Sequence, residues 1–142
     1  MNKTNHGRVL LGGSVAALIL FIVAGIVNGG ILNQEFQTWS QSMGSLIHPL
    51  PQSTAMGIWA LMALVQGIAG VWIYAAIRPR FGAGPKTALL APLALWVPSK
   101  FVVALDFVTL GIFPSQILAG QVIGSLVAMV LGVLAGAKLY KE

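Results

Sequence analysis

Four apolar stretches, each close to 20 residues long, limit what this chain can fold into more than any other feature. They cover about 9–30, 55–77, 88–110 and 115–139. A helix of about 20 residues matches a hydrocarbon core about 30 Å thick. Only 8% of the 142 residues are charged, so a soluble fold could not cover its surface. We therefore predict an all-α integral membrane four-helix bundle that forms a single transmembrane domain over 1–142.

The segment 33–47, between the first two spans, is more polar and has a different pattern. Phe36, Trp39 and Met43 recur at helical spacing, with polar residues on the opposite face. This pattern predicts a short interfacial amphipathic helix, which His48-Pro49 would end. An irregular loop is the alternative interpretation.

The N-terminal stretch could also be read as a signal peptide, because a basic start precedes its apolar run. The run is longer than a typical signal sequence and has no convincing cleavage site. We therefore expect an uncleaved first span.

The basic residues predict the orientation in the membrane. All except Lys100 occur at the N-terminus, at the C-terminus and in the loop between spans two and three, and the other two connections have none. By the positive-inside rule, both termini are cytoplasmic. Three of these cations are expected to face anionic lipid head groups on the cytoplasmic side: Arg78, Arg80 and Lys86.

Small residues recur every four positions in the last apolar stretch. Such a ridge lets helix backbones approach closely inside a membrane. We expect it to form a helix-packing face, made of Gly120, Gly124, Ala128, Gly132 and Gly136.

The third span is unusual because it carries two charged residues, Lys100 and Asp106. Polar residues on the other spans are expected at similar depths, which predicts one outward-opening pocket. The predicted pocket comprises Asn28, Gln66, Lys100, Asp106, Gln121 and Ser125.

Two interpretations of Lys100 remain open. It could be the central charge of a site for an anionic or polar ligand, or of a proton relay, since intramembrane charges are functional by default. It could instead form a structural ion pair with Asp106, or extend toward the interface. A Ser99–Lys100 catalytic dyad has little support, because adjacent helical residues do not face each other.

The sequence lacks the residues that thiol and metal-dependent chemistry would need. The chain has no cysteine and only two histidines, neither in an apolar stretch. We therefore expect no catalytic site, no metal site and no cofactor. The net charge of +5 is explained by topology, so nucleic acid is not an expected partner.

Two sequence segments carry a family resemblance: the basic turn IRPRFGAGPKTA, over 77–88, and the C-terminal end LYKE. The chain resembles an uncharacterised family of small bacterial four-span integral membrane proteins. The resemblance implies a multi-pass protein of the bacterial inner membrane, but it supplies no activity and no site residues.

These observations favour a structural or accessory membrane protein that packs through glycine-rich helix faces. Its partners would be the lipid bilayer and either a second copy of the chain or a larger membrane complex. The alternative is a small transporter or ligand-binding protein that uses the pocket around Lys100 and Asp106. An enzyme acting on a lipid-soluble substrate is the least favoured interpretation.

Overall fold

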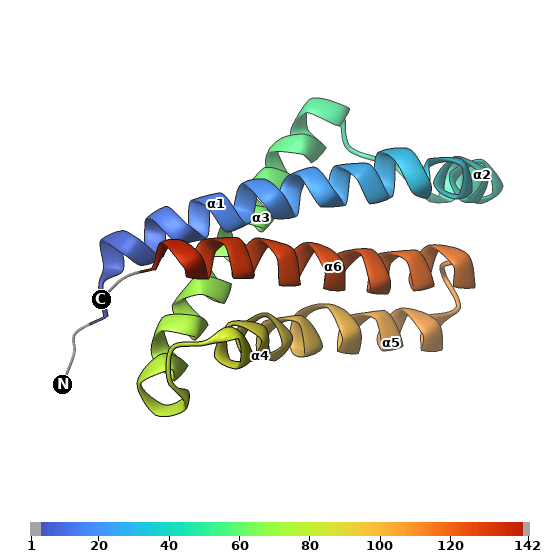
Figure 1. Cartoon of the computed structure of the whole chain (residues 1–142). Coiled ribbons are helices and arrows are strands. Elements are labelled where there is room, and N and C mark those ends of the chain that lie inside the picture. Colours follow the sequence, from blue (N-terminus) through green and yellow to red (C-terminus); the bar gives the residue numbers. More distant parts are fainter. Residues whose placement is uncertain (1–3, 141–142) are drawn as a thin grey trace.

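A computed structural model describes residues 4–140, and all regular secondary structure in these residues is helical (Figure 1). This agrees with the all-α prediction. The elements in chain order are α1 (His6–Gly25), the π-helix η1 (Ile26–Ile31), α2 (Asn33–Met43), the 3₁₀-helix η2 (Gly44–Leu46), α3 (Gln52–Phe81), α4 (Pro85–Trp96), the π-helix η3 (Val97–Phe101), α5 (Val102–Leu110) and α6 (Ser115–Leu139).

Four long segments of this chain are apolar enough, and long enough, to cross a membrane. They are His6–Ile31, Gln52–Phe81, Pro85–Leu110 and Ser115–Leu139. The first joins α1 to η1, and the third joins α4, η3 and α5 into one rod. Each predicted span lies within one of these segments.

The four segments do not surround one another along their whole length. α1, α6 and the α4–α5 rod lie side by side with α6 in the middle, while α3 crosses them at a steep angle (Figure 1). Among the described residues, α3 packs against α1, α4 and α6 but not against η1, η3 or α5. The arrangement therefore differs from a closed four-helix bundle at one end.

The buried residues show where α3 makes contact. They begin at Ala63 and include Gly67 and Gly70. Earlier in the helix Gly57 has nothing within 4 Å of its Cβ position, and Trp59 and Leu61 are 56% and 60% exposed. Close approach therefore occurs only along the second part of α3.

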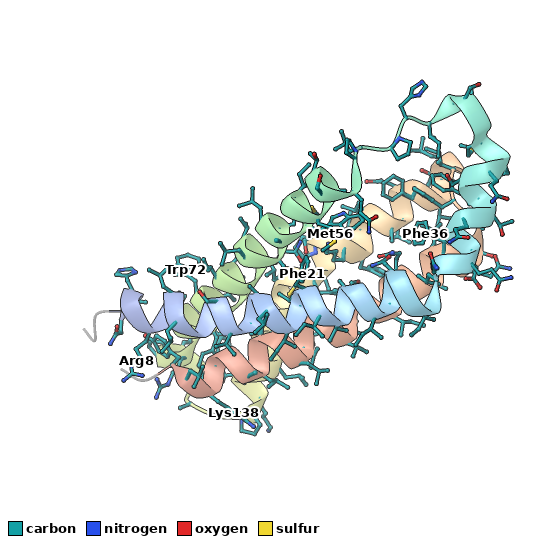
Figure 2. The ribbon with its side chains drawn as sticks, turned by 90° about the horizontal axis from the view of Figure 1, so that it is seen from above. Arg8, Phe21, Phe36, Met56, Trp72 and Lys138 are labelled. Atoms are coloured by element: carbon teal, nitrogen blue, oxygen red, sulfur yellow. The ribbon has the colours of Figure 1, made fainter. Side chains whose placement is uncertain are left out.

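Both chain termini and the α3–α4 turn lie at one end of the molecule, which we call the basic end. Figure 2 shows Arg8 and Lys138 together there. Of the described lysines and arginines, all except Lys100 lie at this end: Arg8, Arg78, Arg80, Lys86 and Lys138.

Tyr140 ties the elements of the basic end together. Its hydroxyl accepts a hydrogen bond from the Asn5 main-chain N–H at 3.3 Å. Its ring meets the Tyr74 ring edge-on, with 6.1 Å between centroids, and the Arg78 guanidinium lies 5.6 Å from its centre. These contacts join both ends of the chain to α3.

The opposite end carries α2, and we call it the α2 end. α2 is nearly perpendicular to the long helices (Figure 1), and its residues occupy most of the predicted amphipathic segment 33–47. The Trp39 indole N–H donates to the Ile112 carbonyl at 2.9 Å, and its ring packs on Phe113 at 4.6 Å. Trp39 therefore holds α2 against the turn between α5 and α6.

Candidate functional site

Two π-helical segments lie on either side of α6 in the α2 half of the molecule. η1 and η3 both pack against α6. Pro98 accounts for η3, because proline has no N–H to donate and disturbs the regular helical ladder. The adjacent glycines Gly29 and Gly30 lie within η1. Single π-turns inside helices are frequent at functional sites, so the residues in and beside η1 and η3 are candidate site residues.

Hydrogen bonds link both π-helical regions to α6. The Gln121 amide donates to the Asn28 side-chain oxygen, and the Asn28 amide donates to the Ala24 carbonyl at 2.8 Å. On the other side of α6, the Trp96 indole N–H donates to the Ser125 hydroxyl at 3.0 Å. We call Asn28, Trp96, Gln121 and Ser125 the polar layer.

Lys100 belongs at the level of the polar layer. It follows Trp96 by four residues, less than one turn of the π-helix η3, so the two lie close together along the helix. Phe101 and Val122 line one groove, which places η3 beside the part of α6 between Gln121 and Ser125. The Lys100 side chain therefore starts next to the polar layer, and it is half-buried.

Asp106 does not join this group. It lies six residues beyond Lys100, about 9 Å toward the α2 end, and its side chain is exposed. Its main-chain carbonyl accepts a hydrogen bond from the Thr109 hydroxyl at 2.7 Å. Within residues 4–140 no ion pair joins Asp106 to Lys100.

Gln66 also lies away from the polar layer. Its neighbour Gly67 packs against Ala17 of α1, whereas Val27, the neighbour of Asn28, packs against Gly124. Positions 17 and 27 are about 15 Å apart along α1. The structure thus groups Asn28, Lys100, Gln121 and Ser125 and leaves Gln66 and Asp106 outside.

The polar layer is open to one side. Because α3 does not pack against η1 or η3, no fourth helix covers this part of the molecule in the described chain. Asn28, Lys100, Gln121 and Ser125 are all half-buried rather than enclosed. The helices of the described chain therefore do not enclose the layer.

The ridge of small residues on α6 lies against the first span. A Cβ on Gly136 would come within 2.5 Å of the Gly12 carbonyl oxygen, and one on Gly132 within 2.8 Å of the Ala16 carbonyl oxygen. At Gly124 and Gly120 the facing side chains are Val27 and Leu32, and Ala128 is 2% exposed. The four glycines of the ridge therefore face residues of the same chain: α1, η1 and the adjoining Leu32, with Val71 of α3 also at Gly136.

The predicted head-group cations all lie at or beside the α3–α4 turn. Arg80 and Lys86 are exposed, whereas Arg78 is half-buried over the Tyr140 ring. The Thr87 hydroxyl donates to the Gly82 carbonyl at 2.7 Å, which closes the turn. Arg80 and Lys86 are thus free to reach phosphates, while Arg78 also helps to join the chain ends.

The structure offers no support for the catalytic dyad. The Ser99 hydroxyl donates to the Leu95 carbonyl at 2.6 Å and is held within its own helix. The described residues also contain no cluster of three or more side chains able to hold a metal ion.

Sequence reasoning did not anticipate the hydrogen bond from Trp96 or the two π-helices. Pro98 and the Gly29-Gly30 pair were the signals that could have indicated a disturbed helix at these positions.

Comparison with known proteins gave no match: no protein-family model, no curated protein and no solved structure matches this chain.

Proposed function

We propose that this chain is a multi-pass protein of the bacterial inner membrane whose polar layer, together with Lys100, binds an anionic ligand. Four apolar helical segments support the membrane setting. Every described lysine and arginine except Lys100 lies at the basic end. By the positive-inside rule, this distribution supports cytoplasmic termini. Anionic lipid head groups would then meet Arg80 and Lys86.

The observation that carries the proposal is the position of Lys100. In the membrane it would lie far from the basic end, half-buried beside polar side chains and without an ion pair to Asp106. A lysine within a span costs roughly 2.5–3.5 kcal/mol on insertion scales. A ligand carrying a carboxylate, phosphate or sulfonate would offset this cost and would accept hydrogen bonds from the lysine.

The packing of α6 favours ligand binding over the accessory role. The accessory role relied on a glycine ridge available to other helices, and residues of the same chain face the glycines of that ridge. By contrast, the polar layer is accessible because α3 leaves it uncovered.

Ligand-dependent stabilisation tests the proposal. Wild type and Lys100→Met would be purified in mild neutral detergent and titrated with decyl phosphate or decyl maltoside. A ligand at about 100 times its Kd stabilises by about 2.7 kcal/mol. We expect decyl phosphate to raise the melting temperature of wild type but not of Lys100→Met, and decyl maltoside to raise neither.

Lys138→Met is the matched control, because it removes an exposed cation at the basic end that is not among the predicted head-group cations. It should retain the full response to decyl phosphate. An equal response in Lys100→Met and Lys138→Met would contradict the proposal.

One observation keeps the accessory role as a second candidate. Gly25 and Gly29, a small-xxx-small pair, have nothing near their Cβ positions, and Ile22 and Ile26 beside them are 51% and 58% exposed. A helix from a second copy or from a larger complex could pack there. Gly25→Leu should then reduce oligomeric size in detergent, and an unchanged size would remove this candidate.

A further inference from the structure

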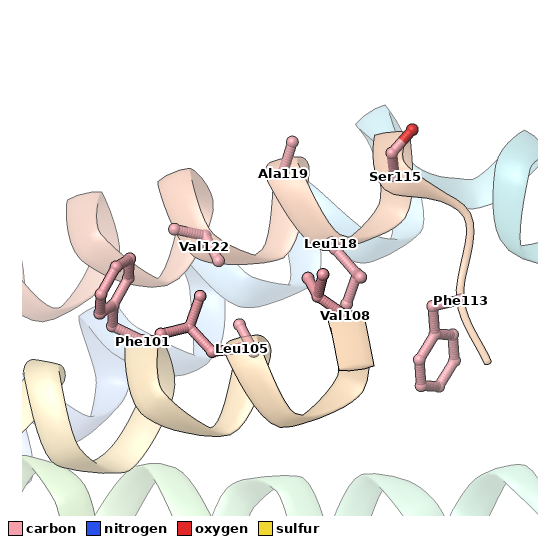
Figure 3. A pocket seen from close by; sticks show the side chains of 9 residues that line it. Phe101, Leu105, Val108, Phe113, Ser115, Leu118, Ala119 and Val122 are labelled. Atoms are coloured by element: carbon pink, nitrogen blue, oxygen red, sulfur yellow. The ribbon is translucent and has the colours of Figure 1, made fainter. Parts of the chain in front are cut away.

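A groove runs between α5 and α6 on the side of the molecule away from the α1–α6 contact. Its volume is about 450 Å³. In Figure 3, side chains from α5 and α6 face each other across it, with Phe101 near one end and Phe113 at the other. The lining residues are Phe101, Ala104, Leu105, Val108, Phe113, Ser115, Leu118, Ala119 and Val122.

The groove exists because α5 and α6 pack loosely. α4 packs closely on α6, but the π-helix at Val97–Phe101 interrupts the rod before α5 begins. Beyond it, Leu105 and Val108 of α5 remain 49% and 59% exposed although they adjoin α6. The result is an apolar furrow that is open along its length.

The dimensions favour a thin occupant. Ser115 and Val122 are seven residues apart, so the groove extends about 10 Å along α6. A helix about 10 Å across would need about 800 Å³ over that length. The groove offers about half of this, so a neighbouring helix does not fit within it, whereas an extended hydrocarbon chain does.

A polar groove adjoins the apolar one at the α2 end. It has a volume of about 420 Å³ and is lined by Gln34, Glu35, Thr38, Trp39, Ser42, Pro114 and Gln116. Trp39 of the polar lining packs on Phe113 of the apolar lining, with 4.6 Å between ring centroids, so the two grooves adjoin there. The only charge in the polar lining is the Glu35 carboxylate, and no cation is present.

We propose that the two grooves together bind one outer-leaflet phospholipid whose head group ends in an ammonium. Its acyl chain lies between α5 and α6, and its head group lies against α2. The Glu35 carboxylate attracts the ammonium, while the amide and hydroxyl groups of Gln34, Thr38 and Gln116 hydrogen-bond the rest of the head group. This inference rests on the membrane insertion and orientation proposed above, but not on the ligand at Lys100.

Native mass spectrometry of the detergent-purified protein tests the inference. The probes are two lipids with identical acyl chains, one with an ethanolamine head group and one with a glycerol head group. The anionic glycerol lipid can also bind the cations of the basic end and Lys100, so binding in the grooves is taken as the retention that is lost when the groove is filled by Val122→Trp. By that measure wild type should retain the ethanolamine lipid about fivefold more than the glycerol lipid, as expected for one exposed ionic contact. By the same measure Glu35→Gln should retain both lipids equally.

The apolar groove is tested with a pair of adjacent substitutions. Val122→Trp fills the groove, whereas Ile123→Trp adds the same side chain at a position that is 63% exposed. Retention of the ethanolamine lipid should fall at least about tenfold in Val122→Trp relative to Ile123→Trp.

Three results would overturn the inference: no lipid retained by wild type, equal retention in Val122→Trp and Ile123→Trp, or an unchanged preference in Glu35→Gln. Membrane insertion is measured separately, as resistance of the membrane-bound chain to carbonate extraction. A failure of insertion is thereby distinguished from a failure of lipid binding.

Discussion

The two halves of this molecule are held together by different physical means. In the basic half, small residues let α1, α3 and α6 approach until main-chain atoms touch, as where Gly12 meets Gly136. In the α2 half, π-helices interrupt regular helix, polar side chains hydrogen-bond to α6, and α3 does not pack on η1, η3 or α5. The comparison indicates that the first half provides rigidity and that the second leaves space for a ligand.

The largest effect is expected where two backbones touch in the basic half. A Cβ on Gly67 would lie 2.6 Å from the Ala17 main-chain nitrogen, so Gly67→Ala should lower the stability by about 1–3 kcal/mol. Thermal unfolding in detergent measures this change.

Gly57→Ala in the same helix is the control. Nothing lies within 4 Å of its Cβ position, and alanine is the better helix former by about 1 kcal/mol. It should leave the stability unchanged or raise it slightly. If both substitutions destabilise equally, close backbone contact is not what distinguishes the basic half.

A smaller effect is expected from the hydrogen bond between Gln121 and Asn28 in the polar layer. Gln121→Leu leaves the Asn28 oxygen without its donor and should cost about 1 kcal/mol. Adding Asn28→Leu should recover part of the loss, and a double-mutant cycle by thermal unfolding measures the coupling. Additive effects would mean that the two amides do not act as a pair.

The smallest effect is expected at the contact between α2 and the α5–α6 turn. Trp39→Phe keeps an aromatic ring but removes the donor to the Ile112 carbonyl, which should cost about 0.5–1 kcal/mol. Trp59→Phe, at a site that is 56% exposed, should cost less. Faster hydrogen exchange in α2 for Trp39→Phe alone would locate the change, and equal exchange in the two variants would argue against the contact.

Much of the fold could be predicted from hydrophobic pattern alone. Each of the four predicted spans lies within one long helical segment, because apolar length determines where such helices form. The course of α3 could not be predicted in this way. Whether a helix packs along its whole length depends on the sizes of the side chains that meet it, as where Gly67 meets Ala17. A single sequence does not show which residues of two helices meet.

The site was predicted only in part, for a related reason. The predicted pocket included both Gln66 and Asn28, but α3 contacts α1 at Ala17, about 15 Å along the helix from Val27 beside Asn28. The prediction also treated the third span as a regular helix, and the π-turn at Pro98 alters which residues share a face. Helix depth can be counted from a sequence, whereas crossing angles and π-turns depend on tertiary packing.

The central claim is that Lys100 is retained for a ligand rather than for folding. The most direct test is the thermal stability and oligomeric size of Lys100→Met, without added ligand, beside Lys138→Met and wild type. A buried charge without an ion pair opposes folding, so we predict that Lys100→Met is at least as stable as wild type and unchanged in size. A lower melting temperature or dissociation in Lys100→Met alone would show that Lys100 holds the helices together, and would contradict the claim.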